Sequence, residues 1–260
     1  MNAIVKWRPQ LDSVYCMDAL TFLGTLDSGS VDAVISDFPY NTTACEWETD
    51  LALSSMFWRE LRRVSKPNGA ILTTCSEPFT SLITVNNRDI LRHIWVWEKS
   101  RATGYLNANR QPMKAHEDIR VFAAAKVRYY PQMGEGIPYR ATSGAAGGHV
   151  RDKTVGGYLT INNGERFPRS VLFFPSEGNA LHPTQKPLRL YEYLVRTYTR
   201  PGDTVLDPFA GSGTTLVAAQ KLGRRFIGCD LSPEYVEIAR QRLAEPYTLP
   251  LFADMSQEGA

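Results

Sequence analysis

The chain alternates strand-like and helix-like segments along most of its 260 residues. Short apolar runs of strand length are separated by stretches with helical spacing of apolar residues. This alternation predicts a mostly parallel sheet with helices on both faces. We therefore expect a three-layer α/β domain with a seven-stranded sheet. The expected strands are SVYC, VDAVIS, GAILTTC, HIWVWE, IRVFAAA, TVLD and RFIGCD, and the expected helices are 18–26, 51–65, 188–199, 214–222 and 233–243.

One of these strands runs directly into a carboxylate. The apolar run VDAVIS is followed by Asp37, Phe38, Pro39 and Tyr40. Asp and Pro are poor strand formers, so the strand must end at this point. An acid, a fixed backbone carbonyl and an aromatic ring are then expected together at one edge of the sheet.

A second strand leads into a glycine-rich loop. TVLD ends at Asp207 and is followed by Phe209, Ala210, Gly211, Ser212 and Gly213, with a helix beginning near Thr214. Glycines let the backbone approach a ligand closely, and the first turn of a helix has free N–H donors. The next strand ends at Asp230, where an acid can accept hydrogen bonds from ribose hydroxyls.

The details of this loop exclude two common nucleotide sites. A P-loop needs a lysine beside its last glycine, and none is present. Leu216 stands where the dinucleotide fingerprint has its third glycine. The remaining interpretation is a nucleoside-binding unit that lacks a phosphate-binding motif. S-adenosylmethionine is a nucleoside ligand without phosphate.

The middle of the chain is basic and partly rich in glycine. Residues 86–169 hold 14 Lys and Arg against 7 Asp and Glu, a local charge of +7, while the whole chain carries only +2. A basic segment suits a polyanion-binding surface, although a solvated basic face is the plain alternative. Residues 134–168 hold eight of the 19 glycines, and we interpret them as a mobile insert that orders on a partner. A flexible linker is the alternative.

The sequence also argues against several classes of protein. No apolar run approaches the roughly 18 residues of a membrane span, and the N-terminus lacks the apolar segment of a signal peptide. The cysteines Cys16, Cys45, Cys75 and Cys229 are scattered without a C-x-x-C pair, which favours neither disulfides nor zinc. We expect a cytoplasmic protein without a metal site and without membrane association.

Three motifs in one order resemble those of a known enzyme family. DFPY at 37–40, HPTQKP at 182–187 and DPFAGSGTT at 207–215 look like the catalytic, cofactor-flanking and cofactor motifs of amino-methylating DNA methyltransferases. The order, catalytic motif before cofactor motif, is similar to the circularly permuted β class. The family usually has D-P-P-Y or S-P-P-Y, so Phe38 is a departure. The segment 96–122 also resembles a branch of phage and bacterial adenine methylases.

The resemblance covers roughly 12–245 and implies a fold and a site. It implies a Rossmann-like, S-adenosylmethionine-dependent methyltransferase domain filling 1–260, with a DNA-recognition insert around 100–180. Asp37 and the carbonyl of Pro39 would accept hydrogen bonds from the target amine, and Tyr40 would stack on a flipped base, with Phe38 beside it. The implied cofactor site comprises Asp18, Asp37, Lys186, Asp207, Phe209, Ala210, Gly211, Ser212, Gly213, Thr214 and Asp230. The expected DNA-binding residues are Arg140, Arg151, Lys153, Arg166 and Arg169.

The expected reaction is methylation of adenine N6 in double-stranded DNA, because Asp before x-Pro-Tyr leans that way within the family. Cytosine N4 is the rival target, and a non-catalytic DNA-binding module is the rival of another class. Methylation of RNA or of protein amides is a further alternative. A homodimer and a cognate restriction endonuclease are the other partners that the resemblance suggests.

Overall fold

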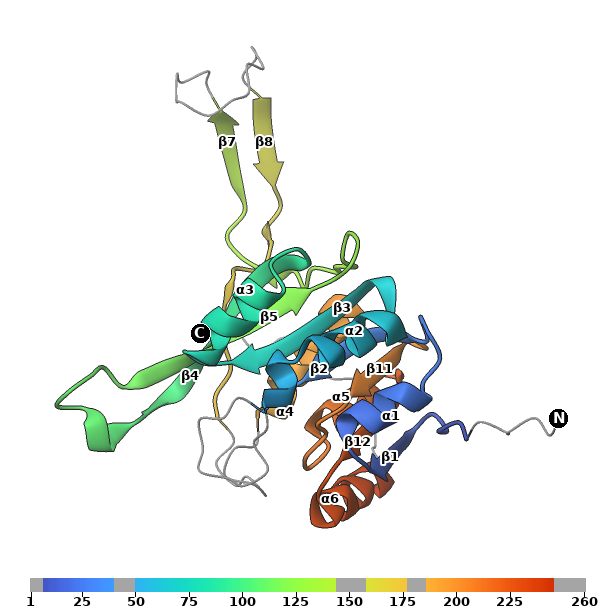
Figure 1. Ribbon diagram of the computed structural model, residues 1–260. Helices are drawn as coiled ribbons and strands as arrows, with labels where there is room; N and C mark the ends of the chain where they lie inside the picture. The colour runs from blue at the N-terminus through green and yellow to red at the C-terminus, as the bar shows by residue number, and fades with distance from the viewer. Residues whose placement is uncertain (1–6, 40–49, 144–157, 177–185, 246–260) are drawn as a thin grey trace. The chain divides into compact units, whose positions relative to one another are not determined.

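The computed structural model describes residues 7–39, 50–143, 158–176 and 186–245. Its contacts divide the chain into two units, one of residues 1–130 with 170–260 and one of residues 131–169. Figure 1 draws both units.

The larger unit is built on an eight-stranded sheet in the order β1-β12-β11-β2-β3-β5-β4-β10 (Figure 1). Neighbouring strands are parallel from β1 to β3 and again between β4 and β10. Among the described strands of this sheet, only β5 runs antiparallel to both of its neighbours. The expected α/β fold with a mostly parallel sheet is confirmed. The strands are β1 Ser13–Cys16, β2 Val31–Ser36, β3 Ser65–Cys75, β4 Leu91–Thr103, β5 Lys114–Phe122, β10 Val171–Phe173, β11 Thr204–Asp207 and β12 Arg225–Asp230.

All seven expected strands belong to this sheet, and the strand that sequence reasoning missed is β10. Its three residues lie at the sheet edge, where Leu172 is buried while Val171 and Phe173 are exposed. Three residues are too few to show a period, so the count of seven is corrected to eight.

Helices cover both faces of the sheet and give the expected three layers (Figure 1). One core holds side chains of α1–α3, such as Phe22, Phe57 and Ile83, and the other holds side chains of α4–α6. Helix α3 was not expected, because its sequence is rich in β-branched residues and no side chain caps its start. The helices are α1 Ala19–Thr25, α2 Ser55–Val64, α3 Phe79–Asn86, α4 Leu188–Tyr198, α5 Thr214–Lys221 and α6 Pro233–Ala244, with short 3₁₀ turns at Asp50–Leu53 and Tyr105–Asn107.

The parallel strands β1, β12, β11 and β2 are consecutive neighbours, so their carboxyl ends meet at one edge of the sheet. This edge therefore collects the residues that follow Cys16, Ser36, Asp207 and Asp230. Ligands of open α/β sheets bind outside the carboxyl ends of the strands. Among the described helices, none has the length and apolar character needed to cross a membrane.

The smaller unit contains two short antiparallel ladders. Strand β6 Gly134–Glu135 pairs with β9 Glu165–Arg166, and β7 Tyr139–Ser143 pairs with β8 Tyr158–Asn162. The described part of the glycine-rich region is therefore a β-ribbon and not an irregular loop. Tyr, Thr, Leu and Ile favour strands in this segment. Leu159 and Ile161 are nevertheless exposed, so the ribbon does not bury one face against a core.

Candidate active site

The loop after β2 is held by the end of the neighbouring strand β3. The Thr74 hydroxyl donates a hydrogen bond to Oδ1 of Asp37. The backbone N–H of Phe38 donates to Oγ1 of Thr73 at 3.1 Å. Both threonines are almost fully buried. Sequence reasoning missed them, and paired hydroxyls at the end of a buried strand were the available signal.

Lys186 lies against the Asp37 carboxylate. Its Nζ is 3.1 Å from Oδ2 of Asp37 and 2.8 Å from Oε2 of Glu117. The resemblance implied Lys186 as part of the cofactor site, and the structure brings it to Asp37. Glu117 was not among the residues predicted for the site. Tyr40 lies outside the described residues, whereas Pro39 is described and half-buried.

The groups around Asp37 shift its pKa in opposite directions. Burial raises the pKa of Asp37, the Lys186 charge and the Thr74 hydroxyl lower it, and the Glu117 charge raises it, with a net upward shift. The Asp37 side chain nevertheless keeps 30% of its surface exposed, and solvent at this opening limits the shift. Asp37 is therefore a fixed carboxylate that a substrate group can reach.

The glycine-rich loop is open at one glycine and tightly packed at another. Gly211 has φ of +49°, and a Cβ placed on it would meet no atom within 4 Å. Gly213 has φ of +80°, and its Cβ would lie 2.8 Å from Cβ of Ala239 on α6. The loop therefore rests on α6 at Gly213 and presents bare backbone at Gly211.

Two carboxylates stand on adjoining strand ends beside this loop. Asp230 is the last residue of β12 and accepts hydrogen bonds from the N–H groups of Gly211 and Ser232, at 2.8 and 2.9 Å. Asp18 follows β1, whose Cys16 pairs with Asp230, and it caps α1 by accepting from the N–H of Thr21 at 2.9 Å. Bare backbone near two acceptors fits a nucleoside with ribose hydroxyls.

Asp207 faces the protein interior. It is 3% exposed and accepts hydrogen bonds from the Ser36 hydroxyl at 2.6 Å and from the Phe209 N–H at 3.1 Å. Burial raises the pKa of Asp207 to about 6. Asp207 thus joins the loop after β11 to the end of β2.

The loop is also fastened from α6. Nη1 of Arg242 donates to the carbonyl and hydroxyl oxygens of Ser212, at 2.6 and 3.1 Å, and to the Thr214 hydroxyl at 3.2 Å. These two hydroxyls therefore serve the packing of the loop. Arg242 was missed in the sequence, where it resembles an ordinary helix arginine. Ala210 is buried and donates its N–H to the Cys229 carbonyl at 2.9 Å.

Phe38 does not lie where the sequence predicted it. It was expected beside the target base, but its side chain is fully buried. Its ring packs against Phe57 and Trp58 of α2 at 5.4 and 6.1 Å between centroids, and against Phe209 at 5.7 Å. The aromatic ring that replaces proline therefore joins the loop after β2 to the glycine-rich loop through the core.

The basic residues of the small unit differ in their surroundings. Arg140 and Arg169 are exposed. Arg166 stacks over Tyr139 at 5.0 Å and donates to Asn162 and to the carbonyl of Ile137, so its guanidinium is engaged within the unit. Arg151 and Lys153 lie outside the described residues.

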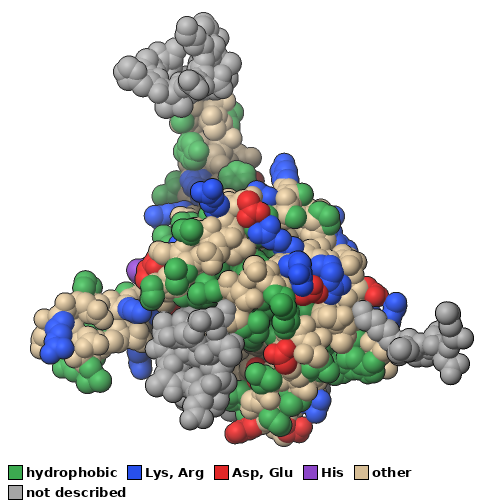
Figure 2. Space-filling model, in the orientation of Figure 1, with side chains coloured by type: hydrophobic (Ala, Val, Ile, Leu, Met, Phe, Trp, Pro, Cys, Tyr) green, Lys and Arg blue, Asp and Glu red, His purple; other side chains and the backbone are tan. Residues whose placement is uncertain are grey.

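The tip of the β4–β5 hairpin forms an exposed basic arm of residues 101–116. Every residue of the arm is exposed, including Tyr105 at 78% and Leu106 at 96%. It carries Arg101, Arg110 and Lys114 and no acid. Figure 2 shows blue and green side chains on this arm, at the left. The sequence placed it inside the recognition insert but indicated none of its residues individually.

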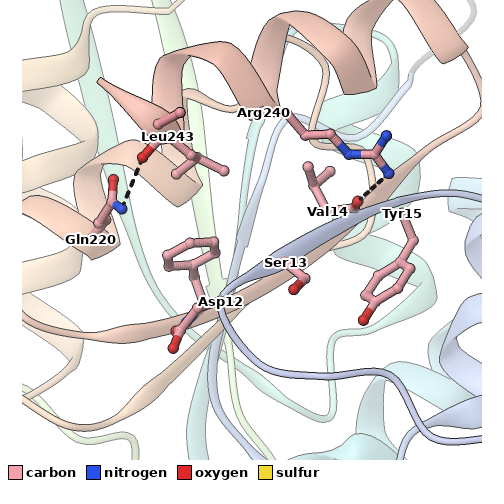
Figure 3. A pocket seen from close by; sticks show the side chains of 9 residues that line it. Asp12, Ser13, Val14, Tyr15, Gln220, Arg240 and Leu243 are labelled. Carbon is pink, nitrogen blue, oxygen red and sulfur yellow. Dashed lines mark hydrogen bonds between the residues drawn. The ribbon is translucent and has the colours of Figure 1, made fainter. Parts of the chain in front are cut away.

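A pocket of about 380 Å³ lies elsewhere, at the amino ends of β1 and β12 beside α5 and α6 (Figure 3). Its polar side chains bind local backbone: Arg240 donates to the Val14 carbonyl and Gln220 to the Leu243 carbonyl, each at 3.1 Å. No residue predicted for the site lines it. The pocket is therefore separate from the edge that carries Asp37 and Asp230.

A family model of N6/N4 methyltransferases, described as DNA methylase, matches residues 31–241. The chain belongs to this family. This chain is 29% identical over 241 residues to the type II methyltransferase M.HpaI of Haemophilus parainfluenzae, and the alignment covers 88% of this chain and 73% of that one. It is 28% identical to M1.MboII of Moraxella bovis, with 88% and 95% covered. The DNA adenine methyltransferase YhdJ of Escherichia coli K12 is 29% identical, with 87% and 80% covered.

Solved structures agree with the fold of the methylase. The complex of M1.HpyAVI with S-adenosylmethionine has a TM-score of 0.59 at 25% identity, covering 88% of this chain and 98% of that one. TTHA0409 of Thermus thermophilus, complexed with S-adenosyl-L-methionine, has a TM-score of 0.61 at 25% identity, with 89% and 93% covered. The cytosine-N4-specific PvuII methyltransferase reaches 0.66 at 16% identity, a likeness of fold alone, with 95% and 89% covered. The methyltransferase fold and the enzyme class expected from the sequence are confirmed.

Proposed function

We propose that this methylase transfers the methyl group of S-adenosyl-L-methionine to N6 of an adenine turned out of double-stranded DNA. The observation that carries the proposal is the Asp37 carboxylate, fixed by Thr74 and partly open, at the sheet edge that also bears the glycine-rich loop. The relative named as a DNA adenine methyltransferase favours adenine. Cytosine N4 is the alternative target, since an enzyme of that specificity has the same fold.

The residues of the DFPY loop would activate the target amine. An exocyclic amine is a poor nucleophile because its lone pair is delocalised into the ring. Asp37 and the carbonyl of Pro39 would accept its two N–H groups and localise the lone pair on nitrogen. These hydrogen bonds strengthen as positive charge develops, so they favour the transition state over the ground state. Tyr40 would stack on the base once it has left the duplex.

The loop from Phe209 to Gly213 would hold the cofactor, with Asp230 and Asp18 as acceptors for its sugar and base. When bound there, S-adenosylmethionine supplies an electrophilic methyl group on a positive sulfonium. The bare backbone at Gly211 lets the ligand approach closely. Lys186 would contact the carboxylate of the cofactor while remaining beside Asp37.

Basic surfaces would hold the DNA. The exposed basic arm carries three cations, and Arg140 and Arg169 add to them from the small unit. Cations of this kind neutralise phosphates and make affinity depend on salt. The names of the type II relatives favour a cognate restriction endonuclease, a homodimer is a further proposal, and the motif order favours the permuted β class.

The test is to incubate the enzyme with duplex DNA and S-adenosylmethionine and to analyse the nucleosides by mass spectrometry. N6-methyladenine is expected, whereas N4-methylcytosine would establish the alternative. Asp37→Ala should lower the rate by about 100-fold or more and leave cofactor binding largely intact, because the carboxylate serves the amine. A variant that keeps over half of its activity would contradict the role of Asp37.

A further inference from the structure

Glu117 lies in β5, on the far side of Lys186 from Asp37. Its Oε2 is 2.8 Å from Nζ of Lys186, and its Oε1 is 2.5 Å from Nζ of Lys99. The Lys186 ammonium is therefore held between two carboxylates, because Asp37 lies 3.1 Å from it. The side chains of Glu117 and Lys186 are each only 9% exposed.

A buried carboxylate without partners is strongly destabilising, so Glu117 depends on the two lysines that pair with it. Burial raises the pKa of Glu117, but the two lysines outweigh it and the net shift is downward. Glu117 is thus an anion at neutral pH. The cluster of Asp37, Glu117, Lys99 and Lys186 contains two acids and two bases, so its formal charge is zero.

We infer that Glu117 is a positioning residue for methyl transfer: it holds the Lys186 ammonium between two carboxylates, so that the lysine does not fully occupy the Asp37 carboxylate. The inference rests on the proposed role of Asp37 as the acceptor for the target amine. An ammonium drawn wholly to Asp37 would occupy the oxygen that this amine needs. Glu117 supplies the opposing attraction.

Among the described residues, the Cys75 thiol and the Tyr191 hydroxyl near Asp37 carry no charge near neutral pH. Burial raises the pKa of the Cys75 thiol to about 12 and that of the Tyr191 hydroxyl well above its usual value. The Thr74 hydroxyl donates a hydrogen bond but carries no charge. The charges that act most directly on Asp37 are therefore those of Lys186 and Glu117.

These two charges act on Asp37 with opposite sign. Lys186 lowers the pKa of Asp37, whereas Glu117 raises it. Glu117→Gln should therefore move the titration of Asp37 to lower pH, and Lys186→Met should move it to higher pH. A residue that merely supports the fold would lower activity without shifting the acid limb of the rate profile.

The experiment measures kcat against pH for the wild type, Glu117→Gln, Lys186→Met and Glu117→Asp. It also follows the Asp37 carboxyl carbon by NMR titration without cofactor. For Glu117→Gln we expect kcat to fall by about 10- to 100-fold, with KM for DNA little changed. Its acid limb and Asp37 titration should shift downward. In Lys186→Met the acid limb and the Asp37 titration should both shift to higher pH. Glu117→Asp keeps the charge, so both should lie at the wild-type pH.

Glu192→Gln is the matched control, because Glu192 is a partly buried acid paired with Lys221 outside the site. It should leave the acid limb unchanged. An acid limb and Asp37 titration at the wild-type pH in Glu117→Gln would overturn the inference. A wild-type enzyme that methylates no DNA would instead overturn the proposed function, and the carboxyl titration would still report whether Glu117 acts on Asp37.

Discussion

The backbone N–H of Gly211 donates a 2.8 Å hydrogen bond to Oδ2 of Asp230. This bond ties the glycine-rich loop to the end of β12 while the backbone of Gly211 stays open on its other side. The loop is therefore shaped by the protein before a ligand arrives. Sites organised in advance bind with a smaller loss of conformational entropy.

Gly211→Ala and Gly213→Ala should separate binding from stability. Both glycines have positive φ, so alanine costs each variant about 1–2 kcal/mol of stability. At Gly211 the methyl group enters the space proposed for the cofactor, and affinity for S-adenosylmethionine should fall at least about tenfold. At Gly213 it clashes with Ala239, so the Tm should fall further. Calorimetric titration and thermal melts measure both, and unchanged affinity in Gly211→Ala would place the cofactor elsewhere.

Thr74→Val removes the hydroxyl that orients Asp37 at nearly constant volume. We expect kcat to fall by roughly tenfold or more, because the carboxylate loses its fixed geometry, while the KM for DNA changes little. Steady-state methylation kinetics measure this. Thr197→Val is the control, since Thr197 is buried in α4 and its hydroxyl bonds the Tyr193 carbonyl of the same helix. Equal losses of kcat in the two variants would argue against the role of Thr74.

Asp207 should make stability depend on pH. Burial raises its pKa from 3.8 to about 6 in the folded state, so the folded protein prefers the protonated form. Its contribution is fully present below about pH 4 and is lost as the pH rises through 6, by about 3 kcal/mol. Asp207→Asn can keep the hydrogen bonds from Ser36 and Phe209 and should lose this dependence. Tm values at pH 5 and 8 test it, and an identical pH dependence in both proteins would refute the assignment.

The exposed basic arm should contribute to DNA affinity through phosphates. Each phosphate neutralised adds roughly 0.9 to the slope of log affinity against log salt. The double variant Arg101→Ala with Arg110→Ala should therefore flatten the slope by up to about 2. The double variant Arg151→Ala with Lys153→Ala, which lies outside the arm, should flatten the slope by a similar amount. Fluorescence anisotropy at several salt concentrations measures the slope, with cofactor affinity expected to stay constant. Arg225→Ala is the control, because Arg225 pairs with Asp12 at the amino end of β12. If the arm variant and this control have the same salt slope, the arm does not contact phosphates.

Local patterns in the sequence determined most of the sheet and five of the helices. An apolar run that ends in Asp-Phe-Pro-Tyr, or in Asp before a glycine-rich loop, indicates a strand end wherever it lies in the chain. Because the strands are parallel neighbours, those ends had to meet at one edge, and Asp37 and Asp230 could be assigned to it from the sequence. Helix α3 and strand β10 escaped because they are short and carry no strong period or cap.

Only the tertiary structure decided what each side chain does at that edge. Lys186 contacts both Asp37 and Glu117 because Lys186, just before α4, lies beside the end of β2 and beside β5, and no sequence spacing encodes that contact. The burial of Phe38 likewise depends on α2 and on Phe209, which are distant in sequence. Secondary structure follows from short-range patterns, whereas charge pairing and burial depend on which distant segments share a volume. The sequence therefore located the sheet edge that carries Asp37 and Asp230, and the packing of the chain set the electrostatics of Asp37.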